Sequence, residues 1–220
     1  MKPRTLLALE FSTDRRSVAL VRNGVLLAET FQEVGRSTRV FSLVADTLNS
    51  AGVTPAEVDA LAIGIGPGSY TGIRLAISVA QGWSLATGET HSLPVIPISS
   101  FAVLAADVIG SAWLASDAQR DEWAVARVEG GRVVEEARLM GSAEVRLLAA
   151  SARVVGAEIF TRLGVGEAGF PAAAQLGRLA AACDTCVAPE ELSPVYLRTA
   201  AFVKAPVSRS IPGITDHDGP

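Results

Sequence analysis

The stretch GIGPGSYTGIRLA, from Gly64 to Ala76, decides how the rest of the chain is interpreted. The apolar run DALAIGI that leads into it predicts a buried strand, and the apolar periodicity after it predicts a helix from about Thr71 to Thr87. Glycines and a proline separate the two segments, as in a tight turn. The sequence therefore centres on a strand, a turn and a helix, which together are a unit of an α/β fold.

The spacing within this turn departs from those of three familiar functional turns. A GxxxxGK[ST] loop requires a lysine that the turn lacks, and a GxGxxG loop requires glycine where Ser69 stands. A GxSxG nucleophile turn has its serine one place later, and its triad would have to use His91 or His217. The N-terminus of any helix attracts anions through its free backbone N–H groups, so the sequence leaves open whether an anion binds at this turn. Ser69 or Thr71 is predicted to cap the helix. The residues assigned to the turn are Gly66, Pro67, Gly68, Ser69, Thr71 and Gly72.

The helix that follows the turn is apolar on two sides. One stripe consists of Ile73, Ala76, Ile77, Ala80 and Trp83, and the other of Leu75, Val79, Gly82 and Ala86. A sheet covers one side of such a helix, so the second stripe needs another cover. Gly82 and Ala86 are small enough to let a second helix approach closely. A partner interface and coverage by the remainder of this chain are both open at this point.

The other segments predict a mixed sheet with helices on it. An Asn23-Gly24 step divides the apolar runs within Leu6–Glu29, which predicts three antiparallel strands. A helical face of Val40, Leu43, Val44, Thr47, Leu48 and Ala51 follows, and Gly52 ends it. After the central helix we expect a short strand in PVIPI and a helix over Ser99–Ile109. The resulting β-β-β-α-β-α order is that of an α/β domain.

A second unit is predicted from Ser111. It contains a hairpin closed by Gly130-Gly131, a short helix in EVRLLAAS, a strand in RVVGA and a helix over Ala172–Ala182. We therefore expect an N-terminal lobe over 1–110, a smaller C-terminal lobe over 111–200 and a disordered tail over 201–220.

Composition narrows the classes of function. The chain is 49% hydrophobic and carries a formal net charge of −4, which gives no electrostatic case for direct nucleic-acid binding. No signal peptide or membrane-spanning segment is predicted, so the expected location is the cytoplasm. Cys183 and Cys186 form a lone CxxC with too few further ligands for zinc and no preceding strand of the thioredoxin type. Neither a metal site nor a redox role is expected.

The stretch GIGPGSYTGIRLAISVAQGWSLA closely resembles the signature GxGPGSFTGxRxGxxxAxGLA of the TsaB (YeaZ) family. The opening LLALEFSTDRRSVALVRNG, the segment SDAQRDEW and the C-terminal PVYLR (Pro194–Arg198) resemble further family motifs in the same order. The resemblance covers the chain up to about Ala200, and its most specific part is Gly66–Arg74.

This resemblance implies a two-lobe, actin-like (ASKHA) fold and a role in the threonylcarbamoyl modification of adenosine in tRNA. In that family the chain is a non-catalytic activator that binds the catalytic subunit TsaD through two helices of the N-terminal lobe, and TsaE is a further expected partner. A homodimer is expected when the chain is alone. The resemblance implies no cofactor for the chain by itself. It allows ADP or ATP to bind at an interface shared within the complex. The interface residues carried over are Arg36, Arg39, Val40, Phe41, Val44, Arg74, Leu75, Val79, Gly82 and Ala86.

Two other functions remain as alternatives to the role of a TsaD-binding subunit. An actin-like ATPase or phosphotransferase acting alone would use Glu10, Ser12 and Thr13 to bind nucleotide. Glu10 and Phe11 depart from the usual Asp and Thr of the family, which argues against ordinary ATP binding. An M22-type glycoprotease, a name the family has also carried, would need a metal for which we see no ligands.

Overall fold

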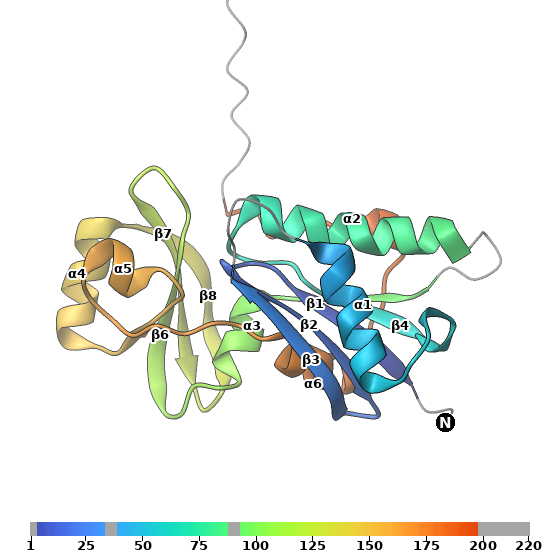
Figure 1. The fold of residues 1–220 in the computed structure, drawn as a ribbon. Coiled ribbons are helices and arrows are strands. Elements are labelled where there is room, and N and C mark those ends of the chain that lie inside the picture. The colour runs from blue at the N-terminus through green and yellow to red at the C-terminus, as the bar shows by residue number, and fades with distance from the viewer. Residues whose placement is uncertain (1–3, 34–38, 88–92, 198–220) are drawn as a thin grey trace, which may run out of the picture.

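The structure is a computed structural model that describes residues 4–33, 39–87 and 93–197, and its chain forms two β-sheets lying side by side (Figure 1). The predicted tail over 201–220 and the predicted interface residue Arg36 lie outside these described residues.

The first sheet has five strands. They are β1 (Thr5–Glu10), β2 (Arg15–Arg22), β3 (Val25–Glu33), β4 (Ala60–Gly64) and β5 (Val95–Ile98), in the order β3-β2-β1-β4-β5. The first three are antiparallel, whereas β4 pairs with β1, and β5 with β4, in parallel. Asn23 and Gly24 both adopt positive φ angles, of 52° and 78°, between β2 and β3. The predicted hairpin is thus confirmed, because a two-residue turn of this kind follows the twist of its strands.

Helices cover both faces of this sheet. Helices α1 (Val40–Ala51) and α2 (Tyr70–Thr87) share one core cluster with Leu7 and Leu9, and the short helix η1 (Pro55–Glu57) leads into β4. Helix α6 (Ala173–Ala181) and part of α3 (Ser100–Ala105) share a second cluster with Leu6 and Ala8. In Figure 1, α1 crosses in front of the strands and α6 lies behind them. The alternation of β1 side chains therefore builds two cores. Helix α3 is shorter than the predicted Ser99–Ile109, because the chain turns at Ala106 and Asp107 with bonds back to Ala102 and Leu104.

Strands β2 and β3 supply hydrogen-bond acceptors at the N-terminus of α6. The Ala173 N–H donates to Ser17 Oγ at 2.8 Å, and the Ala174 N–H donates to Glu29 Oε1 at 2.9 Å. The first N–H groups of a helix have no partner within it, so these bonds fix the place where α6 begins. Burial raises the pKa of Glu29, and the bond from Ala174 opposes that shift.

We expect Ser17→Ala to lower the free energy of unfolding by about 1–2 kcal/mol, because it leaves the buried Ala173 N–H without its acceptor. Urea titration of the variant measures this loss. Ser50→Ala, on the exposed side of α1, is the control and should stay within about 0.5 kcal/mol of the parent. An equal result for both variants would contradict a capping role of Ser17.

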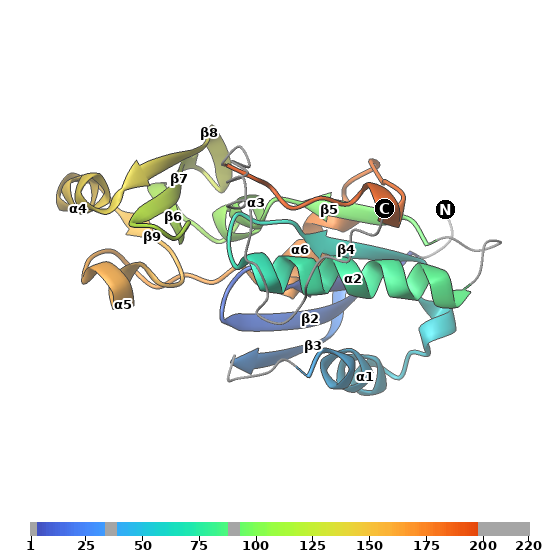
Figure 2. The same ribbon diagram turned by 90° about the horizontal axis from the view of Figure 1, so that it is seen from above.

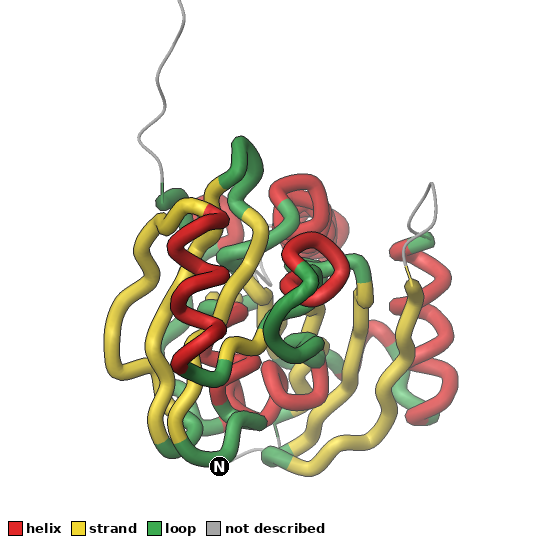
Figure 3. The backbone as a smooth tube through the Cα atoms, turned by 90° about the vertical axis from the view of Figure 1, so that its left-hand side faces the viewer, coloured by secondary structure: helices red, strands yellow, loops and turns green. Residues whose placement is uncertain are grey.

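The second sheet repeats the topology of the first in reduced form. Its strands are β6 (Ser111–Asp117), β7 (Glu122–Glu129), β8 (Arg132–Gly141) and β9 (Val154–Val155), in the order β8-β7-β6-β9. The first three are antiparallel and β9 pairs with β6 in parallel, so the arrangement matches β3-β2-β1-β4. Helices α4 (Ser142–Ser151) and α5 (Ile159–Leu163) accompany this sheet (Figure 3). The predicted mixed α/β class with its β-β-β-α-β-α order is confirmed for the described residues, and the repeat was too weak to recognise in the sequence. Helix α5 was not predicted.

The C-terminal part of the chain connects both sheets. Strand β6 begins at Ser111, where the sequence places the start of the second lobe, whereas α6 packs on the first sheet. After α6 the chain returns alongside β5, where Val187 and Val95 exchange backbone bonds, and passes through the short helix η3 (Pro189–Glu191). It then follows α2 (Figure 2) and reaches the core of the second sheet at Leu197.

Candidate functional site: a helical surface and an interlobe cleft

The glycine-rich turn crosses directly over the backbone of the segment that follows β1. The Ser69 N–H donates to Ser12 O at 2.6 Å. A Cβ on Gly68 would lie 2.2 Å from Ser12 O, and one on Gly72 would lie 1.9 Å from Phe11 O. The Gly72 N–H donates to Ser69 Oγ at 3.3 Å, so Ser69, one of the two predicted residues, caps α2. Two glycines of the turn are therefore explained by contact between two backbone segments.

Glu10 is buried behind this turn. It is 1% exposed, accepts a bond from the Ser12 N–H at 2.9 Å and bonds from Ser100 Oγ at 3.0 and 3.2 Å. Its carboxylate lies against Gly64, where a Cβ would meet Oε2 at 2.1 Å. Burial raises the pKa of Glu10, against the opposing effect of the bonds from Ser12 and Ser100. Glu10 thus joins β1, β4 and α3 within the first lobe.

The three residues considered for nucleotide binding lie together but face inward. Ser12 and Thr13 are 1% and 5% exposed. They line a cavity of about 10 Å³ beside Pro67 and Ser100, a volume that suits one water molecule. None of Glu10, Ser12 and Thr13 is among the residues that line the larger cleft described next.

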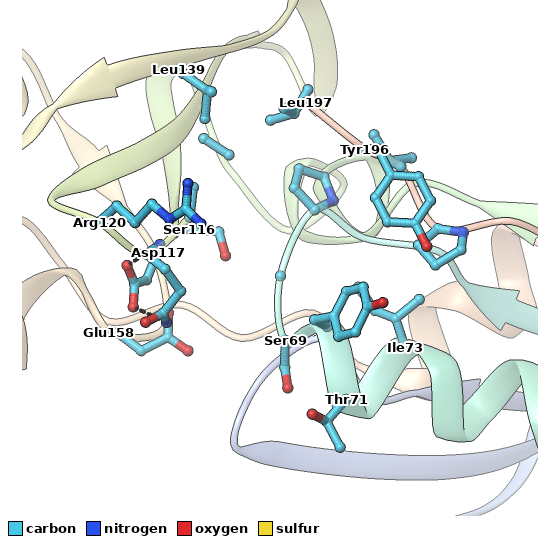
Figure 4. Close-up of a pocket in the computed structure, with 18 of the residues that line it drawn as sticks. Ser69, Thr71, Ile73, Ser116, Asp117, Arg120, Leu139, Glu158, Tyr196 and Leu197 are labelled. Atoms are coloured by element: carbon cyan, nitrogen blue, oxygen red, sulfur yellow. Dashed lines mark hydrogen bonds between the residues drawn. The ribbon is translucent and has the colours of Figure 1, made fainter. Parts of the chain in front are cut away.

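A cleft of about 750 Å³ separates the two lobes. Figure 4 shows Ser69, Thr71 and Tyr196 on one wall and Asp117, Arg120 and Glu158 on the other. Asp117 accepts bonds from the Gln119 N–H at 2.9 Å and from Gln119 Nε2 at 2.8 Å, and it forms an ion pair with Arg162. Burial and the nearby Asp14, from the opposite lobe, raise the pKa of Glu158.

The turn that carries Arg120 into the cleft has an unusual backbone. Gln119, Arg120 and Asp121 have positive φ angles of 63°, 58° and 61°. Each non-glycine residue in this left-handed region costs about 1–2 kcal/mol, so neighbouring contacts must maintain the turn. The Asp121 carbonyl does so by accepting bonds from Ser142 N and Ser142 Oγ at 3.0 and 3.3 Å.

The predicted interface residues divide into buried and exposed groups. Val40, Val44 and Val79 pack in the core of this chain, and Leu75 is half-buried against the same cluster. The exposed group is Arg39, Phe41, Arg74, Gly82 and Ala86. The second stripe of α2 is thus covered in part within the chain, by the cluster that also contains Leu192.

The exposed side of the two helices includes large apolar groups. Phe41 on α1 is 80% exposed and Leu85 on α2 is 83% exposed. A Cβ added to Gly82 meets no atom within 4 Å. Leu85 was not among the predicted interface residues, because it belongs to neither apolar stripe of α2. The sequence did contain a signal for it, since an apolar residue outside both stripes widens the apolar surface of the helix.

Comparison with known proteins identifies the family. The model for TsaD, tRNA N6-adenosine threonylcarbamoyltransferase, matches residues 35–159. The solved structure of YeaZ from Pseudomonas aeruginosa superimposes with a TM-score of 0.71 at 31% identity, covering 88% of this chain and 100% of that one. The chain belongs to the TsaB/YeaZ family.

The similarity to individual relatives covers different shares of their length. TsaB of Haemophilus influenzae, the "tRNA threonylcarbamoyladenosine biosynthesis protein TsaB", is 42% identical over 107 residues, which are 48% of this chain and 43% of that protein. The matched region therefore spans less than half of that TsaB relative. An uncharacterized protein of Mycobacterium tuberculosis is 31% identical over 199 residues, covering 88% of this chain and 92% of that protein.

Two departures from the TsaB/YeaZ pattern have visible consequences. Glu10, longer than the family's usual Asp, is accommodated because Gly64 has no side chain. Asp121 stands in SDAQRDEW at the position of the glycine in the family motif DARxG, which this segment resembles, and it adopts a left-handed conformation that glycine would adopt without strain.

The described residues give no support to a metal site. Within residues 4–33, 39–87 and 93–197, no three His, Cys, Asp or Glu side chains are placed to hold a metal ion. His91 and His217 lie outside those ranges. Cys183 and Cys186 are free thiols. Among the described residues, no helix is both long and apolar enough to cross a bilayer.

Proposed function

We propose that this TsaB/YeaZ chain is a non-catalytic subunit that binds and activates TsaD for the threonylcarbamoyl modification of adenosine in tRNA. The observation that carries the proposal is the exposed side of α1 and α2, where Phe41 and Leu85 are exposed and a Cβ on Gly82 meets no atom within 4 Å among the described residues. A contiguous exposed apolar surface on a well-packed domain is typical of a protein interface. A role in tRNA modification implies the cytoplasm.

The similarity to the TsaD family supports a helix-to-helix arrangement. The matched residues 35–159 include α1 and α2, so TsaD is expected to carry equivalent helices. Related surfaces can pair across an approximate twofold axis, and the same geometry allows two copies of this chain to pair. We therefore propose a heterodimer with TsaD that competes with a homodimer, and TsaE as a further component. Any ADP or ATP would bind at an interface shared within the complex.

Gly82→Leu tests this proposal. We expect it to weaken binding to TsaD at least about tenfold, because a leucine side chain separates helices that would otherwise pack closely. The chain itself should stay folded, since a Cβ at this position meets nothing. Light scattering coupled to size exclusion, with TsaD of the same organism, measures complex formation, and an assay of threonylcarbamoyladenosine formation measures activation.

Ala150→Leu, on the exposed side of α4, is the matched control and should bind as the parent does. Unchanged binding by Gly82→Leu would show that this side of α2 is not the interface. If the parent chain itself fails to bind TsaD, the proposed function falls.

A second candidate, an actin-like ATPase or phosphotransferase acting alone, is favoured by the cleft of about 750 Å³, which is large enough for a nucleotide. Thermal unfolding with and without ATP and Mg²⁺ distinguishes it, because a ligand that binds the native state raises the unfolding temperature. The inward position of Glu10, Ser12 and Thr13 places this candidate second.

A further inference from the structure

Arg74 contacts the side chains of two tyrosines, Tyr70 and Tyr196, at the N-terminal end of α2. Its guanidinium carbon lies 4.4 Å from the centre of the Tyr70 ring. A hydrogen bond with the side chain of Tyr196 raises the pKa of Arg74. The two rings lie 6.4 Å apart at an angle of 50°. We call Tyr70, Arg74 and Tyr196 the aromatic–arginine cluster.

The backbone on both sides of the cluster is fixed. Tyr70 is the first residue of α2, directly after its cap Ser69. Tyr196 follows Val195, whose N–H donates to Ile65 O at 2.9 Å. Upstream, Gln81 Nε2 donates to Pro189 O at 3.3 Å, and Leu192 is buried in the core. The C-terminal segment is thereby bound along the length of α2.

The cluster stays accessible although its backbone is fixed. Tyr70 and Tyr196 are 55% and 53% exposed, and Arg74 is exposed as well. Among the described residues, no acidic side chain forms an ion pair with Arg74. Arg74 thus presents an oriented positive charge to its surroundings.

Arg74 also lies on the proposed interface side of α2. The residues at four-residue spacing, Arg74, Ser78, Gly82 and Ala86, are all exposed. Residues four apart on a helix are surface neighbours, so this row continues from the open position at Gly82 to the cluster. Arg74 itself does not line the cleft, whereas Tyr70 and Tyr196 do, so the cluster lies at the edge between the cleft and this side of α2.

We infer that the aromatic–arginine cluster is part of the partner surface and binds a carboxylate of the partner protein, so that this surface extends from the two helices onto the C-terminal segment. This inference rests on the proposed function. The planar guanidinium matches a carboxylate in bidentate geometry. Arginine and tyrosine are enriched among the residues that dominate binding, and a side chain already held in place loses less conformational freedom on association.

Calorimetry of binding to TsaD tests the inference with three variants. We expect Arg74→Ala to weaken binding at least about 30-fold, the change that corresponds to 2 kcal/mol at an interface residue of this type. Tyr196→Ala removes the ring, and Tyr196→Phe removes only the hydroxyl that meets Arg74, so the first should weaken binding more than the second. The control Arg146→Ala, an exposed arginine on α4, should change affinity less than about twofold.

The dependence on salt identifies a charge contact. Affinity of the parent chain should fall as ionic strength rises, and Arg74→Ala should show a weaker dependence, because exposed charges are screened. Thermal unfolding of each variant alone should match the parent, since the altered side chains are exposed.

Three results would overturn the inference while the proposed function stands. In the first, Gly82→Leu loses TsaD but Arg74→Ala and Tyr196→Ala bind it as the parent does. In the second, Arg74→Ala dissociates only the homodimer. In the third, Arg74→Ala leaves TsaD binding intact and abolishes stabilisation of the chain by ATP, which would assign the cluster to a small anion. A parent chain that does not bind TsaD would overturn both.

Discussion

Gly72→Ala is expected to lower the free energy of unfolding by about 3 kcal/mol or more, although it adds a single methyl group. The new Cβ would lie 1.9 Å from Phe11 O, a backbone atom at the end of the central strand β1. Relief requires α2 to move away from the sheet, and that movement loosens the core cluster shared by Ile73, Ala76 and Leu9. Thermal unfolding should show a midpoint about 6–12 °C lower.

The same substitution almost three turns later on α2 is the control. Gly82→Ala places its Cβ where no atom lies within 4 Å, and alanine is favoured over glycine inside a helix by about 1 kcal/mol. We therefore expect a small rise in the unfolding temperature. The two substitutions in α2 should therefore change the stability of the chain in opposite directions. Similar results for both would contradict the close crossing of turn and strand.

The second large effect concerns pH and Glu10. Burial raises its pKa in the folded chain. Between the ordinary pKa of glutamate, which applies to the unfolded chain, and this higher value, the folded state keeps a proton that the unfolded state has released. The free energy of unfolding therefore falls as pH rises through that window. The slope corresponds to a difference of at most one bound proton between the folded and unfolded states.

Glu10→Gln should remove this dependence. Glutamine can accept the Ser12 N–H and meet Ser100, as the protonated acid does, and it does not titrate. We expect the variant to gain stability relative to the parent as pH increases from about 4 to about 8. Urea unfolding of both chains at successive pH values measures the difference, in which the shared contributions of Glu29 and Glu158 cancel. A difference that stays constant over this range would show that Glu10 has the same pKa in both states.

Local signals predicted most of the first lobe. The Asn23-Gly24 hairpin, the end of α1 at Gly52 in a left-handed conformation and the strand–turn–helix unit at Gly64–Ala76 all follow from residue chemistry within a few positions. Short, weakly periodic elements were harder. The five-residue α5 has no clear pattern, and the predicted helix over Ser99–Ile109 extended beyond the turn at Ala106.

Features that depend on distant parts of the chain were not predictable. The alanine-rich face of α6 indicates burial but not the sheet against which it packs. The periodicity of the sequence predicted that Val40, Val44 and Val79 lie on apolar sides of helices. Only the structure shows that these side chains face the core of this chain. The contact between Tyr196 and Arg74 joins residues that are far apart in the sequence, and nothing local indicates it.

The position of α6 has a consequence for the order of events during synthesis. The strands of the first sheet precede the second lobe in the chain, yet one face of this sheet is covered by α6, whose bond to Ser17 spans 156 residues. While the ribosome is still adding the second lobe, the alanine-lined face of β1 and β2 has no helix over it. A nascent or truncated chain that ends before Ala173 would therefore expose this flat apolar face, and such intermediates are prone to aggregate. High contact order of this kind also slows folding, so completion of the N-terminal lobe should follow release of the C-terminal segment rather than precede it.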